Sequence, residues 1–321
     1  MPERHYLDLE FLSTVKRKIP HRATLTKRLI DWLAIDKDAI YRRLRGEVPF
    51  SFVEMVAIAK KLGISLDSIA GIQSVQSRPT QVVMTRHVNP SSIDYEMFNE
   101  YVDLLKSIKD EPNTLLMESG NALPHHLFYD YEHLTRIYLF GWNQASSFGS
   151  DLQFHDLKIP EQMRNLQKEC CLYTRHIKTT HYVWDRMIFL RMVENIKFAA
   201  RVNLIKAEVV SALKSELLAL LDHLEKLADK GKHDDTGNQV FIYISDLYLE
   251  TGYCCIKSKN RFVSLFKTFL LNSNSAFDEA VYNEVHIWIN ALQKMSTLIS
   301  VSGERLRTEF FNTQREIIHT L

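Results

Sequence analysis

The sequence has no long hydrophobic run, and this absence excludes a class of protein. No stretch of its 321 residues approaches the roughly 20 uninterrupted apolar residues that a membrane-spanning helix needs. The first residues, MPERHYLDLEFL, do not follow the basic-then-apolar order of a secretory signal. We therefore expect a cytoplasmic protein with no membrane partner.

Cysteine is also scarce. The four cysteines form two adjacent pairs, Cys170 with Cys171 and Cys254 with Cys255, and sequence neighbours are poorly placed to bridge each other. We expect four free thiols that act as small buried hydrophobic side chains in a reducing compartment.

The usual signatures of catalysis and metal binding are missing as well. The ten glycines form no phosphate-binding loop, and the HExxH, GxSxG and kinase motifs do not occur. His125 and His126 are adjacent, so on a helix they point about 100° apart, and neither has a second histidine or cysteine four residues on. The sequence therefore predicts no enzyme, no metal site and no cofactor.

What the chain does contain is typical of a globular protein. Apolar residues make up 45% and charged residues 25%, and the length suits two ordinary domains. Residues 1–78 carry 14 Lys and Arg against 9 Asp and Glu, so their net charge is 14 − 9 = +5, and the remainder of the +1 chain carries 1 − 5 = −4. This asymmetry favours a polyanionic partner for the first segment.

Short helices with tight connections are predicted for residues 7–71. Ser51 is followed three residues later by Glu54, which is the pattern of a capping box at a helix start. Residues 72–92 hold two prolines and no sustained period, so we interpret them as a linker. The predicted domains are 1–71 and 93–321.

One stretch has a specific signature, LTKRLIDWLAIDKDAIYRRLRGEVPFSFVEMVAIAKKLGISLDSI at residues 25–69. Its matching features are a helix ending at Trp32-Leu33, a short turn, a capping Asp36, a second helix containing Ile40, and a closing Arg45-Gly46. This stretch resembles the Cro/repressor-type (XRE-like) helix-turn-helix family, over about one fifth of the chain. The resemblance implies a five-helix DNA-binding domain in which residues 36–45 form the recognition helix.

The resemblance also places candidate contacts with double-stranded DNA. Lys37 and Asp38, in the first turn of the recognition helix, would meet base edges, followed one turn later by Tyr41 and Arg42. The remaining candidates match phosphate-contact positions of the family or could serve that role, and they are Thr26 and Lys27 at the start of the preceding helix, Arg43, and Arg45. Arg43 has the alternative of covering apolar surface with its stem.

Two positions depart from the family pattern. Ala34 stands in the turn where the family has glycine, and Ile30 stands where it has a small residue between the helices. An alanine with positive φ costs about 1 kcal/mol relative to glycine. This cost is tolerable, and we expect the turn to be slightly altered.

The second domain is predicted to be α-rich. Helical patterns cover 93–110, 125–143, 159–176, 181–200, 203–230, 278–297 and the segment after Ser302. In 203–230, apolar residues from Val210 to Leu227 step by three and four, which suits either a packed helical bundle or a dimer interface. In residues 239–270, β-branched and aromatic residues alternate in short runs that are separated by turn-like segments. We interpret this region as a three-stranded antiparallel meander. The predicted fold class is therefore mainly α with one small sheet.

These patterns indicate a DNA-binding transcriptional regulator. One short recognition helix makes few base contacts, so we expect a homodimer that pairs through helix 203–230 or through the terminal helices 278–321. Three roles remain open for the second domain: sensing of a small-molecule or peptide effector, plain dimerisation, or partner binding. The alternative function is a protein-interaction or dimerisation scaffold in which the helix-turn-helix is only structural.

Overall fold

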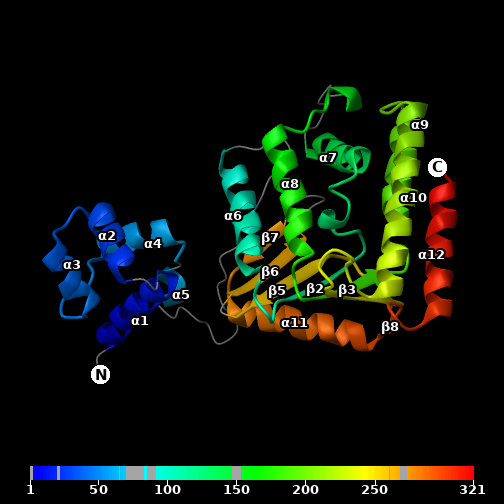
Figure 1. The fold of residues 1–321 in the computed structure, drawn as a ribbon. Helices are drawn as coiled ribbons and strands as arrows, with labels where there is room; N and C mark the ends of the chain where they lie inside the picture. Colours follow the sequence, from blue (N-terminus) through cyan, green and yellow to red (C-terminus); the bar gives the residue numbers. More distant parts are fainter. Residues whose placement is uncertain are drawn as a thin grey trace. The chain divides into compact units, whose positions relative to one another are not determined.

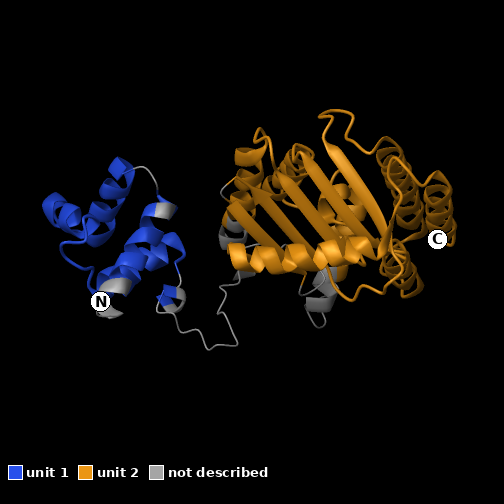
Figure 2. Ribbon diagram, turned by 90° about the horizontal axis from the view of Figure 1, so that it is seen from below, with its two compact units in different colours: residues 1–81 blue, residues 82–321 orange. Residues whose placement is uncertain are grey.

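The computed structural model divides the chain into two compact units, Met1–Gln81 (unit 1) and Val82–Leu321 (unit 2) (Figure 2). It describes residues 3–19, 22–64, 66–69, 83–84, 92–146, 153–259, 261–267 and 273–321. The segment 72–92 expected as a linker lies outside the described residues, apart from 83–84 and 92. Among the helices in the described ranges, none is long and apolar enough to cross a membrane.

Unit 1 is a cluster of helices around a small apolar core. Its elements are α1 (Glu3–Lys18), α2 (Arg22–Leu33), α3 (Lys37–Leu44), α4 (Phe52–Leu62) and α5 (Leu66–Ile69) (Figure 1). The predicted capping box is confirmed, since Ser51 and Glu54 each accept the other's backbone N–H at the start of α4. Leu25 and Leu29 of α2 and Ile40 of α3 are buried in the shared core, which fixes the two helices against each other.

Unit 2 is built on a mixed sheet whose strands run in the order β1-β7-β6-β5-β2-β3-β4-β8. Strands β2, β3 and β4 are parallel, and the other pairings are antiparallel. The strands are β1 (Val83–Met84), β2 (Leu115–Gly120), β3 (Thr179–Asp185), β4 (Gln239–Ser245), β5 (Tyr253–Ser258), β6 (Arg261–Lys267), β7 (Ser273–Ala276) and β8 (Ser296–Leu298).

Helices cover both faces of this sheet. In Figure 2, α11 (Glu279–Lys294) crosses the near face, and the other helices of unit 2 lie beyond the sheet. The larger core contains residues of these other helices, and the smaller core packs α11 against the opposite face. The far-side helices are α6 (Ser92–Ile108), α7 (Glu132–Ser146), α8 (Glu161–Thr174), α9 (Leu190–Arg201), α10 (Ala207–Lys230) and α12 (Glu304–His319), with the short turns η1 (His125–Leu127) and η2 (Phe154–Asp156).

The expectation of a mainly α chain with a three-stranded meander is wrong. Strand β2 lies in the segment 111–124, for which the sequence predicted no element, and β3 overlaps the start of the predicted helix 181–200. The segment 239–270 does contain three strands, but β4 pairs with β3 and β8, not with β5. Parallel strands buried on both faces have no clean alternation of apolar and polar residues, so their pattern is hard to separate from that of a helix.

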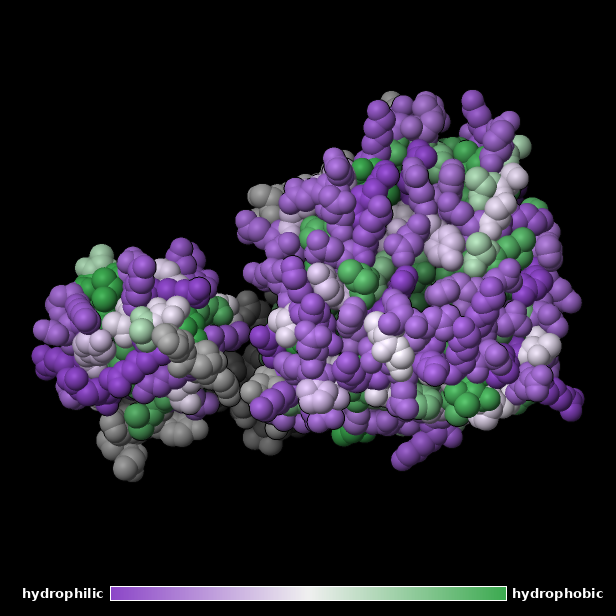
Figure 3. Space-filling view, in the orientation of Figure 1, coloured by the Kyte–Doolittle hydropathy of each residue, from purple (hydrophilic) through white to green (hydrophobic). Residues whose placement is uncertain are grey.

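The apolar stripe of α10 is used inside unit 2. Leu213, Leu217, Leu220, Leu224 and Leu227 are all buried in the larger core. The reading of this stripe as a bundle face is therefore correct, and the stripe is not available as a dimer interface. In the view of Figure 3 the surface of each unit is mostly hydrophilic, and hydrophobic residues show as small separate groups.

Candidate functional site

The turn between α2 and α3 sets the geometry of the first candidate site. Ala34 has a φ of 52°, so the backbone is left-handed at the position where the family pattern has glycine. The Asp36 carboxylate then accepts the backbone N–H of Ala39 at 2.8 Å and begins α3. Since Ile40 and Leu44 bury one side of α3, the opposite side of this helix faces outward.

The outward side of α3 is rich in charge. Lys37, Asp38 and Arg42 are exposed, and Tyr41 is half-buried beside them. The Lys37 Nζ lies 5.7 Å from the centre of the Tyr41 ring, and the Arg22 Cζ lies 5.8 Å from it. The Tyr41 ring thus makes cation–π contacts with side chains from the first turns of both α2 and α3. Arg22 was missed from the sequence because α2 begins at this residue, before Thr26 and Lys27, which the resemblance placed at the start of the helix.

Arg45 and Arg42 stand at the far end of α3, and both lie close to the Glu47 carboxylate. Arg45 holds Glu47 through both of its oxygens, at 2.5 and 3.0 Å, and Arg42 Nε is 3.9 Å from the same carboxylate. Hydrogen bonding to Arg45 lowers the pKa of Glu47. All three side chains are about half exposed, so these ion pairs are weak and both arginines can exchange Glu47 for another anion.

Two of the residues predicted to contact phosphate, Thr26 and Arg43, instead bond to other groups of unit 1. Thr26 lies one turn inside α2, is buried, and donates its hydroxyl proton to the carbonyl of Arg22 at 2.9 Å. Arg43 is largely buried and makes a two-point ion pair with Glu54 at 2.9 and 3.1 Å. Both side chains therefore serve the packing of unit 1, whereas Lys27 is exposed.

A second candidate site is a cavity of about 370 Å³ in unit 2. It opens at the carboxyl end of β2, the edge of a parallel sheet where loops leave room for a ligand. A Cβ added at Gly120 of β2 would lie 3.3 Å from the Cα of Gly252, just before β5, so these two glycines let the strand ends approach. Asn121 fixes the same region by donating its amide to the carbonyl of Glu250 at 3.0 Å.

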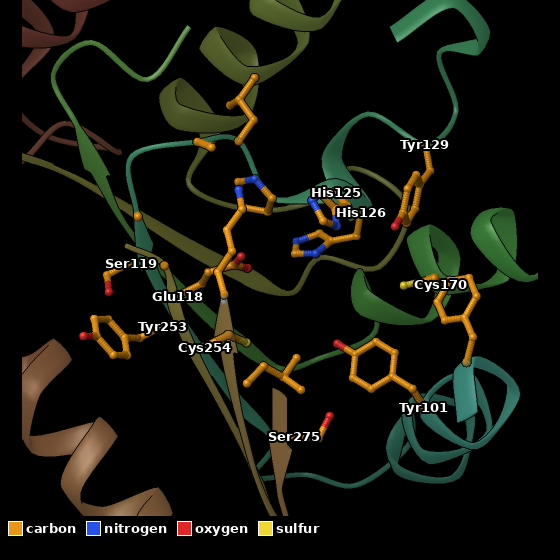
Figure 4. Close-up of a pocket in the computed structure, with 18 of the residues that line it drawn as sticks. Tyr101, Glu118, Ser119, His125, His126, Tyr129, Cys170, Tyr253, Cys254 and Ser275 are labelled. Carbon is orange, nitrogen blue, oxygen red and sulfur yellow. The ribbon is translucent and has the colours of Figure 1, made fainter. Parts of the chain in front are cut away.

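Side chains from several elements converge on this cavity (Figure 4). Glu118 comes from β2, Cys254 from β5, Tyr101 from α6, and Cys170 from α8. The hydroxyl ends of Tyr101 and Tyr129 point toward its middle in the figure. The site therefore combines aromatic walls with polar groups that face inward.

One acid, Glu118, and one base, Lys267, belong to this cavity. Burial raises the pKa of the Glu118 carboxyl to about 8, while the Lys267 ammonium acts in the opposite direction. Burial in turn lowers the pKa of Lys267, and Glu118 opposes that change. The two side chains therefore interact through space and influence each other's charge. Glu118 and Lys267 lie within ordinary strand sequences and belong to no recognisable motif, so the sequence did not mark them as functional residues.

The histidine pair also lies at this cavity, in roles other than metal binding. His125 Nε2 bonds with the Tyr138 hydroxyl, and His126 Nε2 bonds with the Tyr182 hydroxyl at 2.8 Å. Burial lowers the pKa of His126 to about 3, so this ring is neutral at pH 7. In the part of the chain that the structure describes, no three His, Cys, Asp or Glu side chains group to hold a metal ion, and all four cysteines are buried free thiols.

Comparison of the chain with protein-family models, with curated proteins and with solved structures finds no match. The functional argument therefore depends on the geometry of the two candidate sites.

Proposed function

We propose that the protein is a sequence-specific DNA-binding transcriptional regulator, and that α3 enters the major groove of double-stranded DNA. The observation that supports the proposal is the charged outward side of α3, held out by a buried α2–turn–α3 pair. The resemblance of residues 25–69 to XRE-like helix-turn-helix domains gives the same orientation. Unit 1 also carries the basic excess that a polyanionic partner requires.

Each exposed residue has a proposed role. Lys37 and Arg42 donate to guanine O6 and N7, and Asp38 accepts from cytosine N4. Tyr41 holds Lys37 and Arg22 in place through its ring. The phosphate contacts fall to Arg22, Lys27 and Arg45, because these side chains are exposed cations at the edges of the α2–α3 pair.

The proposed active form is a homodimer, since α3 has only eight residues and reads few bases. The sequence offered two dimer interfaces, helix 203–230 and the terminal helices 278–321. Because the apolar stripe of the first is buried inside unit 2, we retain the second. Ile287 and Trp288 of α11 are 61% and 48% exposed, respectively, which is unusual for large apolar side chains. We place the dimer contact on this side of α11. Unit 2 then acts as the regulatory part, without catalysis.

The test is an Arg42→Ala variant measured by fluorescence anisotropy on a duplex that the native protein selects. Loss of one base contact should weaken specific binding by about 10- to 100-fold, or roughly 1 to 3 kcal/mol, and leave nonspecific binding nearly unchanged. A uniform loss on all duplexes would instead make Arg42 a phosphate contact.

Arg201→Ala is the matched control, because Arg201 is an exposed arginine of unit 2. If Arg42→Ala binds every duplex as tightly as this control does, Arg42 does not contact DNA. The scaffold alternative, in which unit 1 is only structural, would then be favoured.

A further inference from the structure

We propose that the cavity at the carboxyl end of β2 binds a small zwitterion with an apolar body, of the α-amino acid type, whose ammonium meets Glu118 and whose carboxylate meets Lys267. The inference concerns unit 2 alone and holds whether or not unit 1 binds DNA. It is argued from polar groups without partners, from the separation of the two charges, and from the apolar walls.

Several polar groups line the cavity without a partner. Across the described residues, no hydrogen bond or ion pair is found for the Glu118 carboxylate, the Lys267 ammonium, or the hydroxyls of Tyr101 and Tyr129. Buried polar groups are normally satisfied, and leaving one without a partner costs about 1 to 3 kcal/mol. Tyr129 is buried and the other three are half-buried, and all four line one hollow, so a polar molecule in the cavity would supply their hydrogen bonds.

The two charged groups are separated in a way that suits a zwitterion. They influence each other's pKa, yet their charged atoms are more than 4.0 Å apart and form no direct ion pair. A ligand that carries one positive and one negative group on neighbouring atoms can bridge this gap, because its ammonium favours the ionised form of Glu118 while its carboxylate pairs with Lys267. A ligand with only one of these groups would leave the other protein side chain without a partner in a desolvated site.

The rest of the cavity requires an apolar body. Phe98 and Leu104 of α6, Leu123, and Leu265 of β6 contribute hydrocarbon and aromatic surface. A cavity of about 150 Å³ lined by such side chains holds one benzene ring. The volume of about 370 Å³ therefore accommodates an amino acid with a large apolar side chain.

Of the other charged groups, Arg191 acts on Lys267 through space as a second cation and further favours an anionic group of the ligand there. His126 is neutral at pH 7 and bonded to Tyr182, and His125 is bonded to Tyr138. Glu100 lines the mouth and is exposed to solvent. The inner part of the cavity thus presents one carboxyl and one amine.

The test is calorimetric titration of the full chain at pH 8 with four probes. L-phenylalanine and L-leucine are the zwitterions, phenethylamine lacks the carboxylate, and 3-phenylpropionate lacks the ammonium. We expect at least one zwitterion to bind with a Kd below about 1 mM, and both single-charge analogues of phenylalanine to bind at least about tenfold more weakly than L-phenylalanine.

Variants locate the site. Glu118→Gln and Lys267→Met keep side-chain size and remove one charge each, so each should weaken zwitterion binding at least about tenfold. Glu284→Gln and Lys294→Met change exposed charges on α11, across the sheet, and should leave it unchanged.

The outcomes separate clearly. The proposal is overturned if no zwitterion binds up to about 10 mM. It is also overturned if a single-charge analogue binds as tightly as phenylalanine, or if both cavity variants bind like the controls. The analogue series uses the native chain, so it remains decisive even if a variant fails to fold.

Discussion

Glu118 gives the structure a pH dependence that one substitution should remove. Its pKa is about 8 in the folded chain against an ordinary value of about 4.5. Between these pH values the folded chain keeps a proton that the unfolded chain releases, so the free energy of unfolding falls as the pH rises. The slope is at most about 1.4 kcal/mol per pH unit, and the whole window is worth roughly 3 to 5 kcal/mol.

Histidines partly mask this effect in the native protein. His126 and His233 have pKa values lowered to about 3 and about 4, so their folded forms hold fewer protons than the unfolded chain below about pH 6.5. Their contribution makes stability rise with pH in that range and offsets Glu118 there. The net fall should therefore be visible mainly between about pH 6.5 and 8.

Glu118→Gln isolates the carboxyl, because glutamine does not titrate and the histidines are common to both proteins. The stability of the variant relative to the native chain should rise by roughly 3 to 5 kcal/mol from pH 5 to pH 8.5. We would measure urea unfolding at both pH values, with hydrogen exchange of β2 and β3 peptides to follow unit 2. Equal differences at the two pH values would refute a buried, proton-holding Glu118.

Three further predictions concern the turn, an ion pair and the dimer. Ala34→Gly should stabilise unit 1 by about 0.5 to 1 kcal/mol in urea unfolding, because Ala34 has a φ of 52°, and a loss of stability would contradict the strain. Arg43→Ala should lower the free energy of unfolding by about 1 to 2 kcal/mol, because the ion pair with Glu54 is lost, and it should leave the salt dependence of DNA binding unchanged. A shallower salt dependence at unchanged stability would instead make Arg43 a phosphate contact. Trp288→Glu should convert the dimer to a folded monomer in sedimentation velocity, and a persistent dimer would move the interface away from α11.

Unit 1 shows what local sequence patterns can predict. Asp36 and Ser51 were identified as caps because capping depends on residues three positions apart, and both make the expected hydrogen bonds. The positive φ at Ala34 followed from the position of a turn within a family pattern. The hydrogen bond of Thr26 to the Arg22 carbonyl and the ion pair of Arg43 with Glu54 could not be predicted in this way. The first depends on where α2 begins, and the second on the packing of α3 against α4.

Unit 2 shows where such patterns fail. Strands β2 and β3 pair in parallel across more than 60 residues of sequence, and their buried runs resemble helix segments. The cavity unites Glu118 and Lys267 from strands that are separated by β5 in the sheet. The spacing of these two residues in the sequence does not indicate that they lie close together, so the site could be found only from the fold.

The central claim is sequence-specific DNA binding, and selection tests it most directly. The full-length protein would be incubated with a pool of random double-stranded DNA at about physiological salt, and the retained duplexes sequenced. The account predicts enrichment of an inverted repeat, whose spacing would report the distance between two α3 helices. Retention of DNA without any enriched sequence, lost at modest salt, would contradict it.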